Sequence, residues 1–196
     1  MKNRFALITL LFVFLINLFA SSYSFAAEKG PVATAMVFWD EMKRVAAIED
    51  PSQRQDVIFT LFNEHFDFER FYELALIDHW NNWTPEQKEK FASRFKDMFI
   101  NNAVGKFNRL IGKLDQPMRH VAVRKPWGYQ VISIAETNRG NLTITTYLEN
   151  SEQQWKIMDL DIEGALLSRN YRGQFNYILR HDGYEELINR IEHKQT

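Results

Sequence analysis

Three carboxylates, Asp159, Asp161 and Glu163, have the spacing in this chain that is most suggestive of chemistry. They occupy alternate positions of an apolar segment, and alternate side chains of a strand lie on the same face. Neighbouring carboxylates raise one another's pKa, so such a row could supply a general acid and a general base. The same spacing is typical of the solvent-facing side of a half-buried strand, and we favour that interpretation.

Other patterns of catalytic and metal-binding residues are missing from the sequence. No two histidines stand four residues apart, as a helical zinc pair requires. There is no Gly-x-Ser-x-Gly elbow, no phosphate-binding glycine loop and no calcium loop. The absence of cysteine excludes disulfides, thiolate metal sites and a cysteine nucleophile. The sequence therefore predicts no catalytic constellation, no metal and no cofactor.

The N-terminus has the pattern of an export signal. Lys2 and Arg4 precede the 16 residues from Phe5 to Ala20, which are apolar apart from Thr9 and Asn17. Small residues at Ser24 and Ala26 then fit a cut after Ala26, so we expect residues 1–26 to be a cleaved signal peptide. The alternative is a retained membrane anchor, but a spanning helix needs roughly 20 apolar residues. We expect a freely diffusing periplasmic protein, since a lipid-anchored one would need a cysteine.

Residues 27–196 form one domain by length, with no repeat and no low-complexity linker. They hold 22 Lys and Arg against 25 Asp and Glu, a net charge of −3. No basic patch typical of a nucleic-acid binder and no polybasic stretch for anionic lipid surfaces is present. The many aromatic and aliphatic residues suggest an apolar ligand, although a protein core has the same composition.

Helices are predicted at both ends of this domain. Periodicity and start signals indicate helices over about 31–48 and 51–62, and a third that Asp67 caps. Thr84-Pro85-Glu86-Gln87 is a capping box that begins a helix ending near Gly112. Two more helices are predicted over about 168–181 and 183–193.

Between them the period changes to two. We predict strands at about 118–125, 128–136, 142–150 and 155–163. Their short connections require antiparallel neighbours, so the fold class is α+β with a four-stranded curved antiparallel sheet covered by several helices. Such a sheet could enclose an apolar cavity or be filled completely by its helices, and the pattern leaves both open.

Two blocks of sequence resemble the MlaC family, also called the toluene-tolerance family, of periplasmic lipid-binding proteins. The resemblance extends from about residue 30 to 192. The first block runs from Phe66-Asp67-Phe68-Glu69-Arg70 through Trp80 and the capping box to Phe91 and the Phe95–Phe99 helix. The second runs from Trp155-Lys156-Ile157-Met158-Asp159 through Ile162-Glu163-Gly164, Asn170-Tyr171-Arg172, Gln174-Phe175 and Ile178-Leu179 to Gly183.

The resemblance implies a ketosteroid-isomerase-like roll that carries a glycerophospholipid and is not an enzyme. The expected partners are the inner-membrane MCE-domain ring of an ABC transporter and an outer-membrane lipoprotein–porin complex. Shuttling phospholipid between the two would maintain outer-membrane lipid asymmetry. A different lipid such as a hopanoid, or a small roll-fold isomerase or hydrolase using Asp159 or Asp161, remains the alternative. Ile77 and Asn102 depart from the family's usual small and aromatic residues, which leaves head group and tail length open.

The expected lipid-binding residues are inward-facing sheet positions, the segment after Gly164, and aromatic residues of two helices. For each of them ordinary core packing is the alternative. They are Phe95, Phe99, Val131, Ile134, Ile144, Tyr147, Met158, Leu160, Ile162, Ala165, Leu166, Leu167, Tyr171 and Phe175.

Overall fold

The computed structural model of the chain describes residues 30–111, 117–137 and 140–193, and the predicted signal peptide with its cut at Ala26 lies outside them. The predicted order of helices, strands and helices is confirmed. The N-terminal helices are α2 (Pro31–Ala46), α3 (Pro51–His65), α4 (Phe68–Ala75) and α5 (Pro85–Ile111), with a short 3₁₀ turn at Trp80–Asn82. The C-terminal helices are α6 (Leu167–His181) and α7 (Gly183–His193).

The helices begin where the sequence predicts because side chains satisfy their first N–H groups. The carboxylate of Asp50 accepts from the Gln53 N–H at 2.7 Å, and that of Asp67 accepts from the Arg70 N–H at 3.0 Å. At the start of α5, Thr84 and Gln87 exchange backbone and side-chain hydrogen bonds of 3.0 and 3.3 Å. The predicted capping box is therefore confirmed.

The sheet has five antiparallel strands, so the prediction of four was wrong. Their order is sequential: β1 (Arg119–Lys125), β2 (Gly128–Thr137), β3 (Gly140–Ser151), β4 (Gln154–Ile162) and β5 (Ala165–Leu166). The additional strand β5 pairs with the end of β4 through a turn in which Glu163 and Gly164 both have positive φ. A two-residue strand carries no detectable alternation, which is why the pattern missed it.

Register sorts the strand residues onto two faces. The face we call inner carries Val131, Ser133 and Ala135 of β2 and the residues paired with them on β3, namely Thr146, Ile144 and Leu142. All six are buried. The opposite face, which we call outer, carries Ile134 and Tyr147. The expectation that these two side chains face inward with Val131 and Ile144 was wrong, because positions an odd number of residues apart on a regular strand face opposite ways.

A β-bulge in β4 resets this alternation. Tyr147 is paired with Asp159 and Leu148 with Ile157, so Met158 is an extra residue without a partner of its own. As a result Ile157 and Leu160 both lie on the inner face although three positions separate them. Asp159 lies on the outer side of the strand, where the start of α6 buries it. The expectation that this residue faces solvent was therefore wrong.

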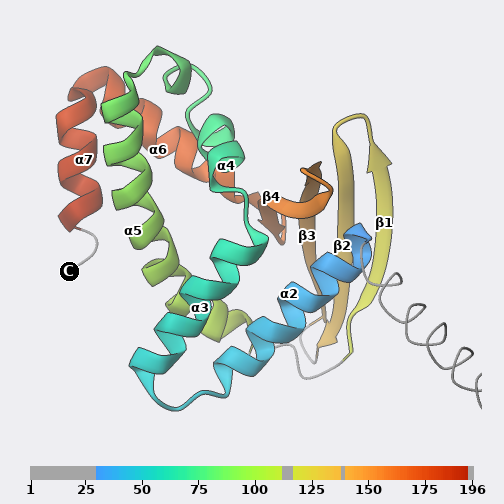
Figure 1. The fold of residues 1–196 in the computed structure, drawn as a ribbon. Coiled ribbons are helices and arrows are strands. Elements are labelled where there is room, and N and C mark those ends of the chain that lie inside the picture. The colour runs from blue at the N-terminus through green and yellow to red at the C-terminus, as the bar shows by residue number, and fades with distance from the viewer. Residues whose placement is uncertain (1–29, 112–116, 138–139, 194–196) are drawn as a thin grey trace, which may run out of the picture.

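Figure 1 shows the helices gathered on one side of the sheet, and the contacts of α2 identify the covered face as the inner one. Helix α2 packs against β1, β2 and β4, and the Trp39 indole donates a buried hydrogen bond of 3.0 Å to the Thr146 hydroxyl. Helices α3, α4 and α6 reach β4, whereas α5 packs on helices α2, α3, α4 and α7. Within the described residues, none of the helices is long and apolar enough to cross a membrane.

The β1–β2 turn provides a test of the register. A Cβ added to Gly128, whose φ is +153°, would overlap the backbone carbonyl oxygen of Leu148 in β3. We expect Gly128→Ala to lower the free energy of unfolding by about 2 kcal/mol or more, since it combines backbone strain with a clash that flexible side chains cannot relieve. Urea denaturation monitored by tryptophan fluorescence measures this.

The control is Gly173→Ala in α6, where nothing lies within 4 Å of the added Cβ. Alanine there should be neutral or stabilising by up to about 1 kcal/mol. Equal effects of the two substitutions would show that the described register of β2 and β3 is incorrect.

Candidate functional site

A buried aromatic cluster is built from side chains of α4, α5 and α6. Phe95 of α5 is fully buried, with its ring centroid 4.9 Å from that of Tyr171 and 5.4 Å from that of Phe175, both on α6. Phe99 lies 5.4 Å from Phe71 of α4 and 6.0 Å from Tyr171. Edge-to-face and tilted contacts of this kind add stability beyond the buried area. Burial also raises the pKa of Tyr171 to about 12, so its hydroxyl stays neutral.

The fourteen expected lipid-binding residues fall into three groups. Seven are buried: Phe95, Phe99, Val131, Ile144, Met158, Leu160 and Phe175. Four are half-buried where β4, β5 and the start of α6 meet: Ile162, Leu166, Leu167 and Tyr171. Three belong to neither group: Ala165 of β5 is exposed, and Ile134 and Tyr147 are on the outer face.

Two polar pairs interrupt the apolar inner face, and both are satisfied. One is the bond from Trp39 to Thr146. The other joins Nδ1 of His120 on β1 to the hydroxyl of the fully buried Ser133, 2.9 Å apart. Burial lowers the pKa of His120, with Asp40 and Lys43 acting in opposite directions, so the imidazole is neutral at pH 7. Each buried polar group in these two pairs therefore has a partner, and neither pair holds a charge.

Asp159, the strongest candidate for an acid or base, serves a structural purpose. It is 3% exposed, and its Oδ1 accepts hydrogen bonds from the backbone N–H groups of Leu160 at 2.8 Å and Ser168 at 3.1 Å. Ser168 stands in the first turn of α6, so the carboxylate holds one of the free N–H groups at that helix end. Burial raises the pKa of Asp159, and the hydrogen bonds from Ser168 and Leu160 oppose that shift.

The other two carboxylates of the row are also accounted for by the turn into β5. Asp161 accepts from the Gly164 N–H at 2.7 Å, which closes the turn. Glu163 is exposed and has the left-handed backbone conformation that the turn needs. Each of the three side chains therefore has surroundings of its own, although Asp161 is near enough to contribute to the raised pKa of Asp159. Among the described residues, no group of three or more His, Asp and Glu could hold a metal ion.

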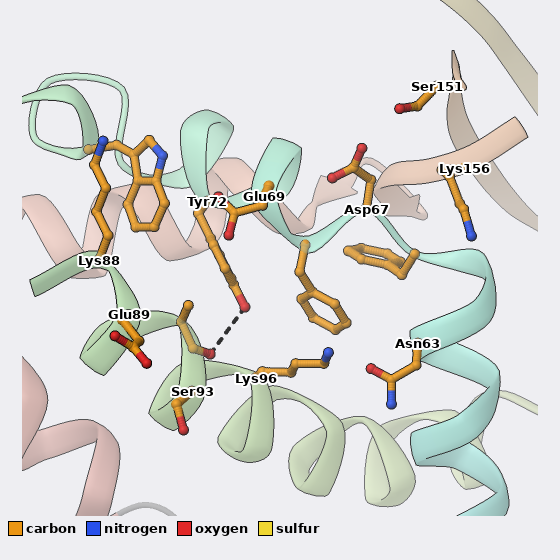
Figure 2. Close-up of a pocket in the computed structure, with 14 residues that line it drawn as sticks. Asn63, Asp67, Glu69, Tyr72, Lys88, Glu89, Ser93, Lys96, Ser151 and Lys156 are labelled. Carbon is orange, nitrogen blue, oxygen red and sulfur yellow. Dashed lines mark hydrogen bonds between the residues drawn. The ribbon is translucent and has the colours of Figure 1, made fainter. Parts of the chain in front are cut away.

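A groove that the sequence reasoning missed lies between α4 and α5. It has a volume of about 780 Å³ and is bounded by the end of α3 and by the turn between β3 and β4. Figure 2 shows Tyr72 and Glu69 on one wall, Glu89, Ser93 and Lys96 on the other, and Ser151 and Lys156 at the far end. Four of its lining residues are buried aromatic side chains: Phe66, Phe68, Tyr72 and Trp80.

The charges around this groove are mixed. The Lys88 ammonium lies 5.2 Å from the Trp80 ring and that of Lys96 lies 5.0 Å from Phe68, both as cation–π contacts. Burial and the neighbouring Asp67 and Glu73 raise the pKa of Glu69, while Lys88 lowers it. The alternation of phenylalanine and acidic residues from Phe66 to Glu69 is the sequence signal that could have indicated this groove. These residues come to lie beside the lysines of α5 only in the folded chain.

Three comparisons relate this geometry to known proteins. A family model described as "MlaC protein" matches residues 34–193. Among solved structures, the phospholipid-binding protein from Ralstonia solanacearum, determined in complex with a phospholipid, aligns with a TM-score of 0.67 and 21% sequence identity. The alignment covers 85% of this chain and 97% of that one, and at this identity it shows a shared fold. No curated protein sequence matches.

Asp159 can be tested by comparing two substitutions. Asp159→Ala leaves the N–H groups of Leu160 and Ser168 without their acceptor and should lower the free energy of unfolding by about 1–3 kcal/mol. Asp159→Asn can keep an oxygen at the same place without a buried charge, so at pH 7 it should cost much less. Urea denaturation of both variants measures the difference.

The pH dependence supplies a second readout. Because the native pKa of Asp159 is raised, its titration favours folding at low pH, and that contribution is lost as pH rises from the ordinary aspartate value through the native one. The wild type should therefore lose stability relative to Asp159→Asn over that interval. An asparagine variant as unstable as the alanine variant would contradict the structural role.

Proposed function

This chain belongs to the MlaC family, and on that basis we propose that it is a periplasmic carrier that binds a phospholipid in its apolar interior. The observation that supports the proposal most strongly is the match of the family model to nearly the whole described domain. A fold shared with a protein solved in complex with a phospholipid supports the same class of ligand. We further propose that sheet and helices form a roll of the ketosteroid-isomerase kind.

The free-energy cost of exposing acyl chains to water explains why such a carrier is needed. Each methylene moved from an apolar site into water costs about 0.8 kcal/mol. Two chains of about 16 carbons would then cost roughly 25 kcal/mol to expose, on the same scale. A carrier must therefore cover both acyl chains and still release them, and it needs apolar walls that can separate without breaking the fold.

The proposed acyl-chain site lies between the inner face of the sheet and the aromatic residues of α5 and α6. Val131, Ile144 and Leu160 would form the sheet wall, with Phe95 and Phe175 opposite. Rings in edge contact can shift apart and repack against chains of similar polarity. Ile134 and Tyr147 do not contribute to this wall, because their side chains are on the outer face.

The mouth of this site would be the seam where β4, β5 and α6 meet. Ile162, Leu166, Leu167 and Tyr171 are half-buried there, while Ala165 is exposed. This partial exposure suits a place where a head group meets water and acyl chains enter. Asp159 holds the first turn of α6 at the same seam. We therefore propose that its role is to position this edge of the site, and that it takes no part in a reaction.

The cellular role follows from the family. We propose that cleavage after Ala26 releases the protein into the periplasm, where it shuttles phospholipid between the MCE-domain ring of an inner-membrane ABC transporter and an outer-membrane lipoprotein–porin complex. Transport of this kind would maintain the lipid asymmetry of the outer membrane. A hopanoid is the main alternative cargo.

Mass spectrometry of the protein purified from periplasm without detergent tests the proposal. We expect the intact mass of a chain that begins at Ala27. Organic extraction should yield about one diacyl phospholipid per protein. Hopanoid in place of phospholipid would change the cargo, and protein free of any lipid would contradict the carrier function. Enzymatic turnover of added lipid that is lost in Asp159→Asn would favour the isomerase or hydrolase alternative.

A pair of substitutions tests which face holds the lipid. Ile162 and Ile134 are both half-buried isoleucines of the sheet, the first packed against the core at the seam and the second on the outer face. We expect Ile162→Glu to lower the amount of co-purified phospholipid at least fivefold, because a carboxylate at the mouth is poorly compatible with acyl chains.

Ile134→Glu is the matched control and should retain lipid at the wild-type level. Thermal unfolding followed by circular dichroism must show that both variants are folded. Loss of lipid from Ile134→Glu alone would move the site to the outer face and contradict the proposed one.

A further inference from the structure

Strand β1 has one edge that is open among the residues that the structure describes. It pairs with β2 without a register shift from Arg119 to Lys125, and within the described sheet β1 is a terminal strand. Figure 1 shows it as the outermost strand, on the side of the sheet away from α5 and α7. Seven residues extend about 23 Å, which is long for an exposed edge. Such an edge is a template for another strand unless the protein blocks it.

The charge of β1 differs from that of the rest of the chain. It holds three basic residues, Arg119, Arg124 and Lys125, and no acidic one, in a chain of formal net charge −1. Arg119 and Arg124 are exposed and Lys125 is half-buried. No described carboxylate lies within ion-pair distance of any of the three, whereas Arg70, Arg94 and Arg190 each have an acidic partner.

The side chains of β1 form two rows with different patterns. The row on the outer face reads Arg119, Val121, Val123, Lys125, so an apolar centre has a cation at each end. Val121 is 48% exposed, although valine is among the residues most often buried. The inner row begins at His120, which α2 approaches through Asp40 and Lys43. A ligand strand alongside β1 would therefore find its free, patterned surface on the outer face.

A second copy of the chain does not fit this edge. Antiparallel pairing of two β1 strands about Ala122 would set Arg119 opposite Lys125 at both ends of the pair. Like charges directly opposite destabilise a strand pair. Charge complementarity instead favours a strand with carboxylates at both ends and apolar residues between them.

We propose that β1 is a docking edge that accepts, by strand addition, an extended acidic segment of a partner protein. The segment would place two apolar side chains beside Val121 and Val123 and carboxylates beside Arg119 and Lys125. Backbone hydrogen bonds along the strand supply affinity in this mode of recognition, and the alternate side chains supply specificity. The proposal does not depend on the identity of the lipid, because none of these residues belongs to the proposed lipid site.

Titration of ¹⁵N-labelled protein with a synthetic peptide tests this. The probe is an acetylated and amidated Glu-Thr-Val-Thr-Val-Thr-Glu, whose alternate residues match the outer row. We expect amide shifts concentrated in residues 119–125 and slower hydrogen exchange at the β1 amides that face away from β2. The same peptide with lysine at both ends should bind at least tenfold more weakly.

The double variant Arg119→Glu, Lys125→Glu is the matched control. It should keep the wild-type melting temperature and bound lipid but reverse the preference, binding the lysine peptide better than the glutamate one. No binding of either peptide would mean that the basic residues only keep strands apart, and would overturn the proposal. Shifts confined to the groove at Lys88 and Lys96, or concentration-dependent protection of β1 without peptide, would overturn it equally.

Discussion

Side chains of a strand alternate between two faces, and the rest of this structure depends on which face each of them occupies. The helices cover the inner face, where α2 is tied to the sheet by the bond from Trp39 to Thr146. That face is apolar, and the hydroxyls of Ser133 and Thr146 have partners within it. The outer face of β1 and β2 has no helix packed on it among the described residues and retains exposed valine and basic side chains. One face therefore suits an apolar ligand, whereas the other suits a protein partner.

The bulge at Met158 shows how one extra residue changes the chemistry of a strand. Without it, Ile157 would lie on the same face as Asp159 and Asp161. With it, Ile157 and Leu160 both reach the core, and Asp159 remains on the outer side under the first turn of α6. Burying a carboxylate is unfavourable unless it is hydrogen-bonded, and two backbone N–H groups supply those bonds. The residue that most resembled a catalytic acid is therefore the link between the sheet and α6.

Much of the fold could be predicted from the sequence because local signals determine it. Asp50, Asp67 and the Thr84–Gln87 box fix the helix starts, and Gly128 and Gly164 mark turns that need unusual backbone angles. Strand faces were harder to predict. Ile134 was assigned to the same face as Val131, although the two stand an odd number of positions apart on one strand. The bulge cannot be seen in an alternating pattern. The groove at Lys88 and Lys96 joins residues from α3, α4, α5 and β4, which only the tertiary structure brings together.

Photoaffinity labelling can locate the acyl chains within the protein. A phospholipid with a diazirine midway along one acyl chain would be loaded into the protein, irradiated, and the labelled residues identified by mass spectrometry of peptides. We expect labels on inner-face and helix residues such as Ile144, Leu160 and Phe95, with Ile134 and Tyr147 unlabelled. Labels on Ile134 and Tyr147, with none on the inner face, would contradict the proposed acyl-chain site.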